Sequence, residues 1–332
     1  MATVEKDIKA SGGDYTTVSS WEAASYGATS SDDAIGYGFN ESYNDNATIN
    51  DATPLSVKLT VKAGEEHDGT PGTGPRQIPT TGTPFVLAVD MTLEGWEASQ
   101  SGTAGNNHGV SMSASNKAYI VHRMIIHDIS QANNWQNVHG IYQPNFGSTS
   151  LTVTNSLVFN IDKTSGNTAR GAWGIRNLKA TGGSYNCTVH NITGNADMGY
   201  GIEQEGVLQN CIATDATGTT AGEDYNSGAT PSTESHNLSS DATAAGTGSL
   251  TSKTASNQYV SIVGEDFKLK AGADAIDAGT DLGTTPTGVN LDCVERDRDA
   301  QGDTWDMGWN ELVPAAGGGP PAGGLALLGV GV

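Results

Sequence analysis

A short phrase recurs four times between residues 107 and 215. Each copy places a glycine between a histidine or aromatic residue and a β-branched residue, and the copies return about every thirty residues: His108-Gly109-Val110, His139-Gly140-Ile141, Trp173-Gly174-Ile175 and Tyr200-Gly201-Ile202. A second phrase, an apolar strand that ends on a polar residue, falls between them at residues 124–129, 156–161 and 187–192, with a fainter copy at 211–215. Two interleaved strand signals of this kind predict a coil whose turns bury their apolar sides only against neighbouring turns.

The composition is typical of many short strands joined by turns. Only 16% of the residues are charged, and 44 of the 332 residues are glycine. The 37 Asp and Glu residues outnumber the 16 Lys and Arg residues, which gives a formal net charge of −21. A surface of this charge repels nucleic acid and anionic membranes, which excludes a phosphate-binding role. It also favours solubility and can collect divalent cations.

Three features bear on where the protein works. Cys187, Cys211 and Cys293 do not form a disulfide framework, and the first two hold equivalent places in successive repeats, where they are expected to be buried. Residues 1–7 lack the basic and apolar regions of a secretory signal. Either a signal has been removed, or the protein is made in a cytoplasm and released otherwise, as virion proteins are by lysis. No run is long enough to span a membrane, so we expect a virion surface or an extracellular location.

The chain divides into three predicted segments. Residues 1–31 are expected to form a strand and a capping helix near residues 18–24, where Ser19 and Glu22 have capping-box spacing and Val18 and Trp21 share one side. Such a helix covers the open first turn of a solenoid. Residues 32–312 are predicted to form the coil, with regular rungs at about 105–215 and a terminal cap at 259–312. Residues 313–332 form a flexible Gly/Pro linker and an apolar tail.

Alignment of the central repeats places equivalent residues in columns. Two columns are apolar or small and are expected to face inward: Met124, Ser156, Cys187 and Cys211, and Ile126, Val158, Val189 and Ala213. Two more are polar: Asn155, Asn186 and Asn210, and Asp128, Asn160, Asn191 and Asp215. Because rungs stack about 4.8 Å apart, side-chain amides can hydrogen-bond from one rung to the next. We interpret the polar columns as structural ladders.

Several phrases resemble those of a known family. Asn186-Cys187-Thr188-Val189-His190-Asn191 and Asn210-Cys211-Ile212 resemble the rung motif of right-handed parallel β-helix proteins of the pectate-lyase-like type. Residues 13–22 resemble their N-terminal start, residues 266–279 a terminal-rung phrase, and residues 292–311 their closing motif. The resemblance covers most of residues 3–312 and implies an all-β fold, a single-stranded right-handed parallel β-helix solenoid. It says little about activity, because this fold hosts lyases, hydrolases, adhesins and phage spikes.

The residues two positions after the repeated glycines are candidates for ligand binding. Ser111, Tyr142, Arg176 and Glu203 should form an outward column, with aromatic residues at the adjoining column and in the preceding loop. Aromatic rings beside Arg, Glu and amides on a long groove suit a polysaccharide. The predicted ligand-binding set is Trp135, Tyr142, Trp173, Arg176, Tyr200 and Glu203. The structural alternative is a surface ion pair between Arg176 and Glu203 beside packed aromatic residues.

Catalytic and metal signals are weaker. Glycoside hydrolysis needs two carboxylates about 5 to 10 Å apart, and Glu203 with Glu205 on one strand could meet this. A lyase would need a cationic or basic residue to remove a proton and acids or a metal to stabilise the anion. The candidates in the regular part of the chain are Arg176 and Lys179 with Asp162 and Glu203. No catalytic residue is therefore assigned, with Glu203, Glu205 and Arg176 as the alternative set. Asp297, Asp299 and Asp303 resemble the start of an EF-hand loop, but Gly308 stands where the loop requires Glu. We expect no cofactor, with a calcium ion here as the alternative.

The C-terminal tail suggests a partner. Burial of its aliphatic side chains would suit docking into a neighbouring subunit: Leu325, Leu327, Leu328, Val330 and Val332. A disordered tail is the alternative. We therefore predict a non-enzymatic display protein, a phage virion component such as a capsid decoration, fibre or spike, forming a homo-oligomer, with a trimer as the first guess, that contacts other virion proteins and glycans. The alternative is a polysaccharide lyase or glycoside hydrolase acting on an extracellular polysaccharide.

Overall fold

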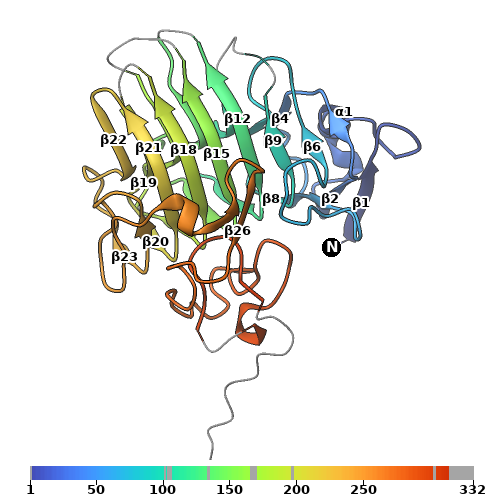
Figure 1. Ribbon diagram of the computed structural model, residues 1–332. Coiled ribbons are helices and arrows are strands. Elements are labelled where there is room, and N and C mark those ends of the chain that lie inside the picture. Colours follow the sequence, from blue (N-terminus) through green and yellow to red (C-terminus); the bar gives the residue numbers. More distant parts are fainter. Residues whose placement is uncertain are drawn as a thin grey trace, which may run out of the picture.

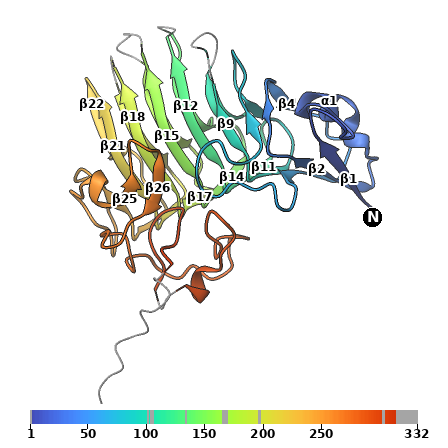
Figure 2. The same ribbon diagram turned by 45° about the vertical axis from the view of Figure 1, so that its right-hand side comes forward.

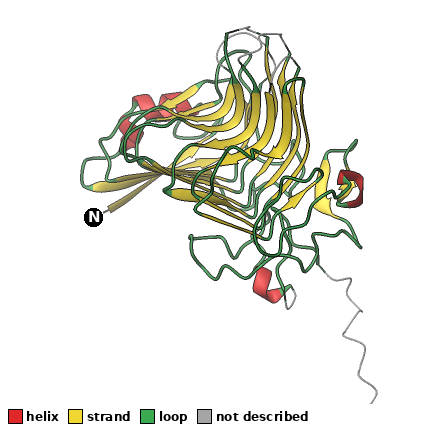
Figure 3. Ribbon diagram, turned by 90° about the vertical axis from the view of Figure 1, so that its left-hand side faces the viewer, coloured by secondary structure: helices red, strands yellow, loops and turns green. Residues whose placement is uncertain are grey.

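The computed structural model describes residues 2–100, 102, 107–132, 135–164, 170–195, 198–301 and 304–313. Within these residues the strands form three long parallel sheets that coil into a right-handed β-helix, as predicted (Figure 1). From β2 onward each turn of the coil contributes one strand to sheet A, the next to sheet B and the third to sheet C. Figure 3 shows these stacked turns from the side. No described helix is long and apolar enough to cross a membrane.

Strand pairing follows the repeat in all three sheets. Sheet A pairs its strands in the order β1 (Ala2–Ile8), β2 (Asp32–Gly38), β5 (Ser56–Val61), β8 (Met91–Glu94), β11 (Ala118–His122), β14 (Ser150–Thr154), β17 (Gly182–Tyr185), β20 (Val207–Gln209) and β23 (Thr233–Ser235). Sheet B contains β3 (Ser42–Tyr43), β6 (Arg76–Gln77), β9 (Glu97–Ser99), β12 (Ile125–Gln131), β15 (Leu157–Lys163), β18 (Thr188–Gly194), β21 (Ile212–Gly218) and β24 (Leu238–Ser239). Sheet C contains β4 (Ala47–Ile49), β7 (Phe85–Leu87), β10 (His108–Met112), β13 (Val138–Gln143), β16 (Ala172–Asn177), β19 (Met198–Gln204) and β22 (Ala221–Tyr225).

The repeated glycines occupy positions where no side chain fits. A Cβ atom on Gly140 would lie 2.3 Å from Val158 Cγ1 and 2.6 Å from the carbonyl oxygen of Gly174, and Gly109 and Gly174 are crowded in the same way. The residue after each glycine, such as Ile141 or Ile175, is fully buried in the core. The predicted inward columns that begin at Met124 and at Ile126 are likewise buried. The glycine phrase therefore serves close packing between the three sheets.

The polar columns mark bends of the chain. Asn155, Asn186 and Asn210 have φ angles of 50°, 50° and 55°, and Asp128, Asn160, Asn191 and Asp215 have φ angles of 51° to 59°. Asn and Asp tolerate this left-handed region better than other non-glycine residues. Asn186 donates to Asn155 at 3.1 Å, Asn191 to Asn160 at 2.8 Å and Asn160 to Asp128 at 3.0 Å. The predicted ladders are confirmed at these positions, whereas Asn210 bonds Thr280 of the C-terminal segment instead.

The N-terminal helix covers the first turn, as predicted. Helix α1 (Val18–Ala23) buries Val18 and Trp21 and is followed by the short 3-10 helix η1 (Ser25–Gly27). The capping box, however, is formed by Thr17 and Ser20 and not by Ser19 and Glu22. Ser19 instead donates to Asp45, and Glu22 accepts from the backbone of residues 50 and 51. The prediction of the capping pair was wrong by two positions because both Thr17 and Ser19 are acceptable N-cap residues.

The C-terminal segment, residues 255–313, lies along the outer face of sheet B. It contains η2 (Ala255–Asn257), the antiparallel pair β25 (Tyr259–Ser261) and β26 (Asp266–Leu269), and η3 (Arg298–Ala300), drawn in orange and red in Figure 2. Its apolar residues Phe267, Met307 and Trp309 form a second core with outward residues of sheet B. Residues 259–312, for which a terminal cap is predicted, thus contact several rungs from the side. The predicted docking residues 325–332 lie outside the described residues.

Candidate functional site

The predicted ligand-binding residues come together on the outer face of sheet C. In the parallel pairing of β13, β16 and β19, Tyr142 lies opposite Arg176, and Arg176 lies opposite Glu203. In a second column of the same face, Trp173 lies opposite Tyr200. Trp135 lies in the turn before β13 and is 74% exposed. We call the outward residues His108, His139, Tyr142, Trp173, Arg176, Tyr200 and Glu203 the sheet C stripe. The outward column that the repeat predicts is therefore present, and the two histidines extend it.

Trp173 is covered on both sides within the stripe. The guanidinium carbon of Arg176 lies 4.4 Å from the ring centroid of Trp173, and the ring of His139 stacks on it at 5.1 Å. Trp173 is consequently only 3% exposed. Arg176 Nε also donates to Glu203 Oε2 at 2.7 Å, and these two side chains are 20% and 13% exposed. The terminal nitrogens of Arg176 have no protein partner among the described residues, so a ligand would meet Arg176 and Tyr142 before the indole ring.

The two histidines of the stripe are neutral. Their Nδ1 atoms lie 3.1 Å apart, so that one ring donates and the other accepts. Burial lowers the pKa of His108 to about 4 and lowers the pKa of His139 well below its ordinary value, with the neighbouring His108 and Arg176 adding to the second shift. The charge of the stripe therefore comes from Arg176 and Glu203, which pair with each other.

The alternative catalytic residues are only partly assembled. Glu203 lies on β19 with one carboxylate oxygen bonded to Arg176, while Glu205 follows the end of the strand and uses its backbone N–H to bond Asn177 O at 3.1 Å. A glycosidase acid needs a carboxyl group that keeps its proton, and a retaining nucleophile needs an accessible oxygen. Arg176 lies between the carboxylate of Glu203 and the ring of Trp173, and both contacts stabilise its positive charge. It is therefore poorly suited to act as a base.

The residues considered for calcium have other partners. Asp297 accepts a hydrogen bond from the backbone of Asp299 at 3.1 Å, and Asp299 accepts from Trp305 Nε1 at 2.7 Å. Asp303 lies outside the described residues. Within the described part of the chain no group of three or more His, Cys, Asp or Glu residues could hold a metal ion. The local bonds of Asp297 and Asp299 explain why this acidic run folds as the turn around η3.

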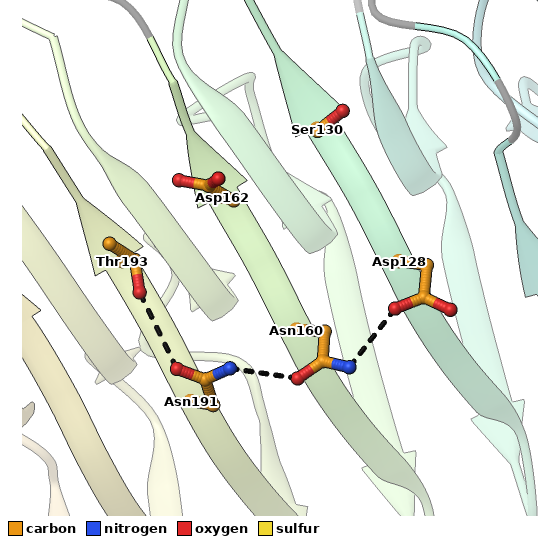
Figure 4. A pocket seen from close by; sticks show the side chains of 6 residues that line it. All are labelled: Asp128, Ser130, Asn160, Asp162, Asn191 and Thr193. Carbon is orange, nitrogen blue, oxygen red and sulfur yellow. Dashed lines mark hydrogen bonds between the residues drawn. The ribbon is translucent and has the colours of Figure 1, made fainter.

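A second site lies on the outer face of sheet B, where β12, β15 and β18 each present two polar side chains (Figure 4). They line a shallow groove of about 390 Å³. One row consists of Asp128, Asn160 and Asn191, which form the ladder described above. The second row lies two residues further along each strand and consists of Ser130, Asp162 and Thr193. We call these six residues the sheet B groove.

Buried charges hold one wall of the groove. His127 Nε2 bonds the buried carboxylate of Glu97 at 2.9 Å, and His127 Nδ1 bonds Asp128 Oδ2 at 2.9 Å. Burial alone would lower the pKa of His127, but the hydrogen bonds to Asp128 and Glu97 outweigh it and raise this pKa to about 9. His127 is therefore a cation at neutral pH. It fixes Asp128, whose other oxygen accepts from Asn160.

The groove was missed as a functional candidate from the sequence. The sequence predicts its first row as a structural ladder, which it is, and of its second row it indicates only Asp162, as a candidate acid of a lyase. The available signal was the pairing of two polar columns, Asp128 with Ser130, Asn160 with Asp162 and Asn191 with Thr193, on one strand after another. Burial also raises the pKa of Asp162, which accepts from Asn195 at 3.0 Å. Such a half-buried carboxylate is suited to accept a ligand's hydroxyl groups.

Comparison with known proteins found similarity to a solved structure but not to a family model or a curated protein. No family model matches the chain, and no curated protein matches it either. The crystal structure of pectate lyase Pel9A is similar to this chain with a TM-score of 0.44 and 13% sequence identity, covering 90% of this chain and 96% of that one. The chain is a parallel β-helix protein.

Proposed function

We propose that this chain is a non-enzymatic surface-display β-helix that contacts glycans. The observation that carries the proposal is the sheet B groove, in which each of three adjacent rungs offers two polar side chains to solvent. Because rungs stack about 4.8 Å apart, a chain-like ligand with regularly spaced hydroxyl groups can bond successive rungs. Asp128 and Asp162 line the groove without a lysine or arginine among its lining residues, which favours a neutral glycan over a polyanion.

The sheet C stripe is the second contact surface in this proposal. Its exposed part combines the Tyr142 ring with the open edge of the Arg176 guanidinium, and both suit the mixed apolar and polar faces of a sugar. Trp173 supports Arg176 from below instead of stacking on the ligand. Exposure on a virion, as a capsid decoration, fibre or spike component, is the setting predicted from the sequence and belongs to the same proposal.

Binding to soluble polysaccharides tests the groove. We expect dextran or galactomannan to bind more tightly than polygalacturonate, because the chain carries a formal charge of −21. Asn160→Ala and Thr193→Ala should each weaken binding of the neutral polysaccharide about tenfold, which corresponds to the loss of about 1.4 kcal/mol. Thr152→Ala, on the outer face of sheet A, is the matched control and should bind like the parent chain. Equal affinities for all three variants would overturn the assignment of the groove.

Turnover decides between this proposal and a polysaccharide lyase or glycoside hydrolase. The same polysaccharides are incubated with the protein, and new reducing ends and unsaturated products are followed over time. We expect neither product to accumulate. Turnover that Glu203→Gln or Arg176→Ala abolishes would replace the display function with an enzymatic one, with these residues as its catalytic groups.

The oligomer is tested through the C-terminal tail. We expect light scattering to show that the full chain forms a trimer or another homo-oligomer. A chain truncated after residue 313 should form an assembly with fewer subunits. The apolar residues that would dock are Leu325, Leu327, Leu328, Val330 and Val332. An assembly state that does not change on truncation removes the tail from the proposal and leaves the groove untouched.

A further inference from the structure

A cavity of about 240 Å³ lies at the last complete coil of the β-helix, away from both the sheet C stripe and the sheet B groove. Its apolar lining includes Ile202, Leu208 and Tyr225, which are buried members of the core. These residues come from β19, β20 and β22, whose strands are yellow in Figure 1. The remaining wall is formed by the turns around residues 226–231 and 243–245. Buried core residues of the solenoid thus form the apolar floor of the cavity.

An inward-pointing carboxylate lines this cavity. Glu234 on β23 continues the inward column of sheet A, in which each preceding rung carries a fully or almost fully buried residue: Leu93, Val121, Val153, Ser184 and Leu208. One oxygen of Glu234 accepts from the backbone of Ala245 at 3.2 Å, and the other has no partner among the described residues. Burial raises the pKa of Glu234. Because β23 is the last strand of sheet A, Glu234 is only partly buried, so water or a ligand that enters the cavity can donate to its free oxygen.

A buried amide lines the same cavity. Gln204 is 1% exposed, and its Oε1 accepts from Ser184 Oγ at 3.0 Å. Its Nε2 is buried and has no hydrogen-bond acceptor within the described part of the chain. An unpaired buried donor costs free energy comparable to a lost hydrogen bond. The cavity therefore combines an unused donor on Gln204, an unused acceptor on Glu234 and an apolar floor.

We infer that this cavity binds the acetamido group of an N-acetylated sugar. An acetamido group supplies a carbonyl oxygen for Gln204 Nε2, an N–H for Glu234 and a methyl group for the floor of Ile202, Leu208 and Tyr225. A sugar that carries a hydroxyl group in place of the acetamido group provides neither the methyl contact nor the same pair of hydrogen bonds. The inference rests on the proposed function only in taking a sugar as the carrier of this group, and it uses residues outside both glycan surfaces.

An opposing explanation exists for Glu234. Inward-pointing charges on the last strands of a sheet prevent association with other chains. In that case Glu234 would protect the end of sheet A and would have no ligand. The substitution Glu234→Leu separates the two explanations, because it restores an apolar residue to the column and should fold at least as stably as the parent chain.

Binding is measured by calorimetry and by ligand-detected NMR on the full chain. N-acetylglucosamine and N-acetylgalactosamine are compared with glucose and galactose, and N-acetylglycinamide supplies an acetamido group without a sugar. We expect at least about tenfold tighter binding of the N-acetylated sugars than of the parent sugars. Glu234→Leu should abolish that preference, and Gln204→Met should weaken it about fivefold to tenfold. Glu5→Gln, an exposed carboxylate on β1 at the opposite end of sheet A from the cavity, is the control and should bind normally.

Three outcomes overturn the inference. Equal affinity for acetylated and parent sugars means that no acetamido site exists. Binding of N-acetylglycinamide as tight as that of the sugars assigns the site to acetylated compounds in general. Self-association of Glu234→Leu, with sugar affinity unchanged, assigns Glu234 to protection of the sheet end. A failure of the proposed glycan function appears separately, because the Asn160→Ala and Thr193→Ala variants would then bind polysaccharide normally whatever the cavity does.

Discussion

The sheet C stripe and the sheet B groove are built from the same repeat, but the side chains of the stripe cover one another and those of the groove stay open to solvent. In the stripe, the ring centroids of His108 and His139 lie 4.7 Å apart and those of His139 and Trp173 lie 5.1 Å apart, so that the rings of successive rungs cover one another. In the groove, Asp128, Asn160 and Asn191 bond along the ladder, yet their polar groups still line an open surface. Flat rings fill the space between rungs, whereas short amides and hydroxyls do not.

Whether a column on a β-helix is covered or open to solvent therefore depends on its side chains and not on the spacing of the repeat. An aromatic column uses its surface for packing, and its contribution is to stability. A polar column with a second polar row beside it leaves hydrogen-bond acceptors and donors open to solvent. Substitutions in the two regions should therefore have different effects on the free energy of unfolding and on glycan binding.

The largest expected difference is in stability. Trp173→Ala removes a buried ring that contacts His139, Arg176 and Tyr200, and should lower the free energy of unfolding by about 3 to 5 kcal/mol. Asp162→Ala in the groove removes a half-buried carboxylate and should change it by no more than about 0.5 kcal/mol. Denaturant unfolding of both variants, followed by circular dichroism, measures this contrast. Similar losses in the two variants would mean that the groove is as much a packing surface as the stripe.

The next difference is in pH dependence, which only the groove should show. His127 beneath the groove has a folded pKa of about 9 against an ordinary value of 6.5. Because the pKa is raised on folding, the stabilisation is fully present below pH 6.5 and is lost as the pH rises toward 9. The loss is up to roughly 3 kcal/mol. Unfolding free energies measured from pH 6 to pH 9.5 should fall in the parent chain and stay flatter in His127→Gln.

The stripe provides the matched control for this titration. His139 is neutral in the folded protein because burial lowers its pKa well below the ordinary value. His139→Gln should therefore leave the slope above pH 6.5 as steep as in the parent chain, even where it lowers stability at every pH. A slope that disappears in His139→Gln and persists in His127→Gln would reverse the assignment of charge to the two regions.

Much of the fold and part of the site could be predicted from the sequence, because the repeat is local. Gly109, Gly140 and Gly174 give the register of sheet C, and that register already places Tyr142, Arg176 and Glu203 in one column. The burial of Trp173 could not be predicted, since it depends on how Arg176 and His139 fold over the ring. The groove beside the ladder does not follow from the repeat, because a ladder accounts for the asparagines by itself.

The position of the C-terminal segment was beyond prediction for a different reason. Asn186 Nδ2 donates to the carbonyl oxygen of Val289 at 2.8 Å, and Asn155 Nδ2 donates to that of Gly288 at 2.9 Å. These partners are separated by 103 and 133 residues, and the turn that carries Gly288 and Val289 lies outside the repeat. The asparagine side chains therefore hydrogen-bond the neighbouring rung on one side and the backbone of the C-terminal segment on the other. The second set of partners cannot be found from a local sequence pattern.

The smallest expected effect concerns the ion pair of the stripe. Arg176 and Glu203 are 20% and 13% exposed, so water screens part of their attraction. In a double-mutant cycle with Arg176→Met and Glu203→Gln, the coupling energy for unfolding should be about 0.5 to 1 kcal/mol. Arg176→Met alone should cost more than Glu203→Gln alone, because it also removes the contact with Trp173. A coupling energy above about 3 kcal/mol would place the pair in a fully desolvated network, and the stripe would then have no charged edge left to offer a glycan.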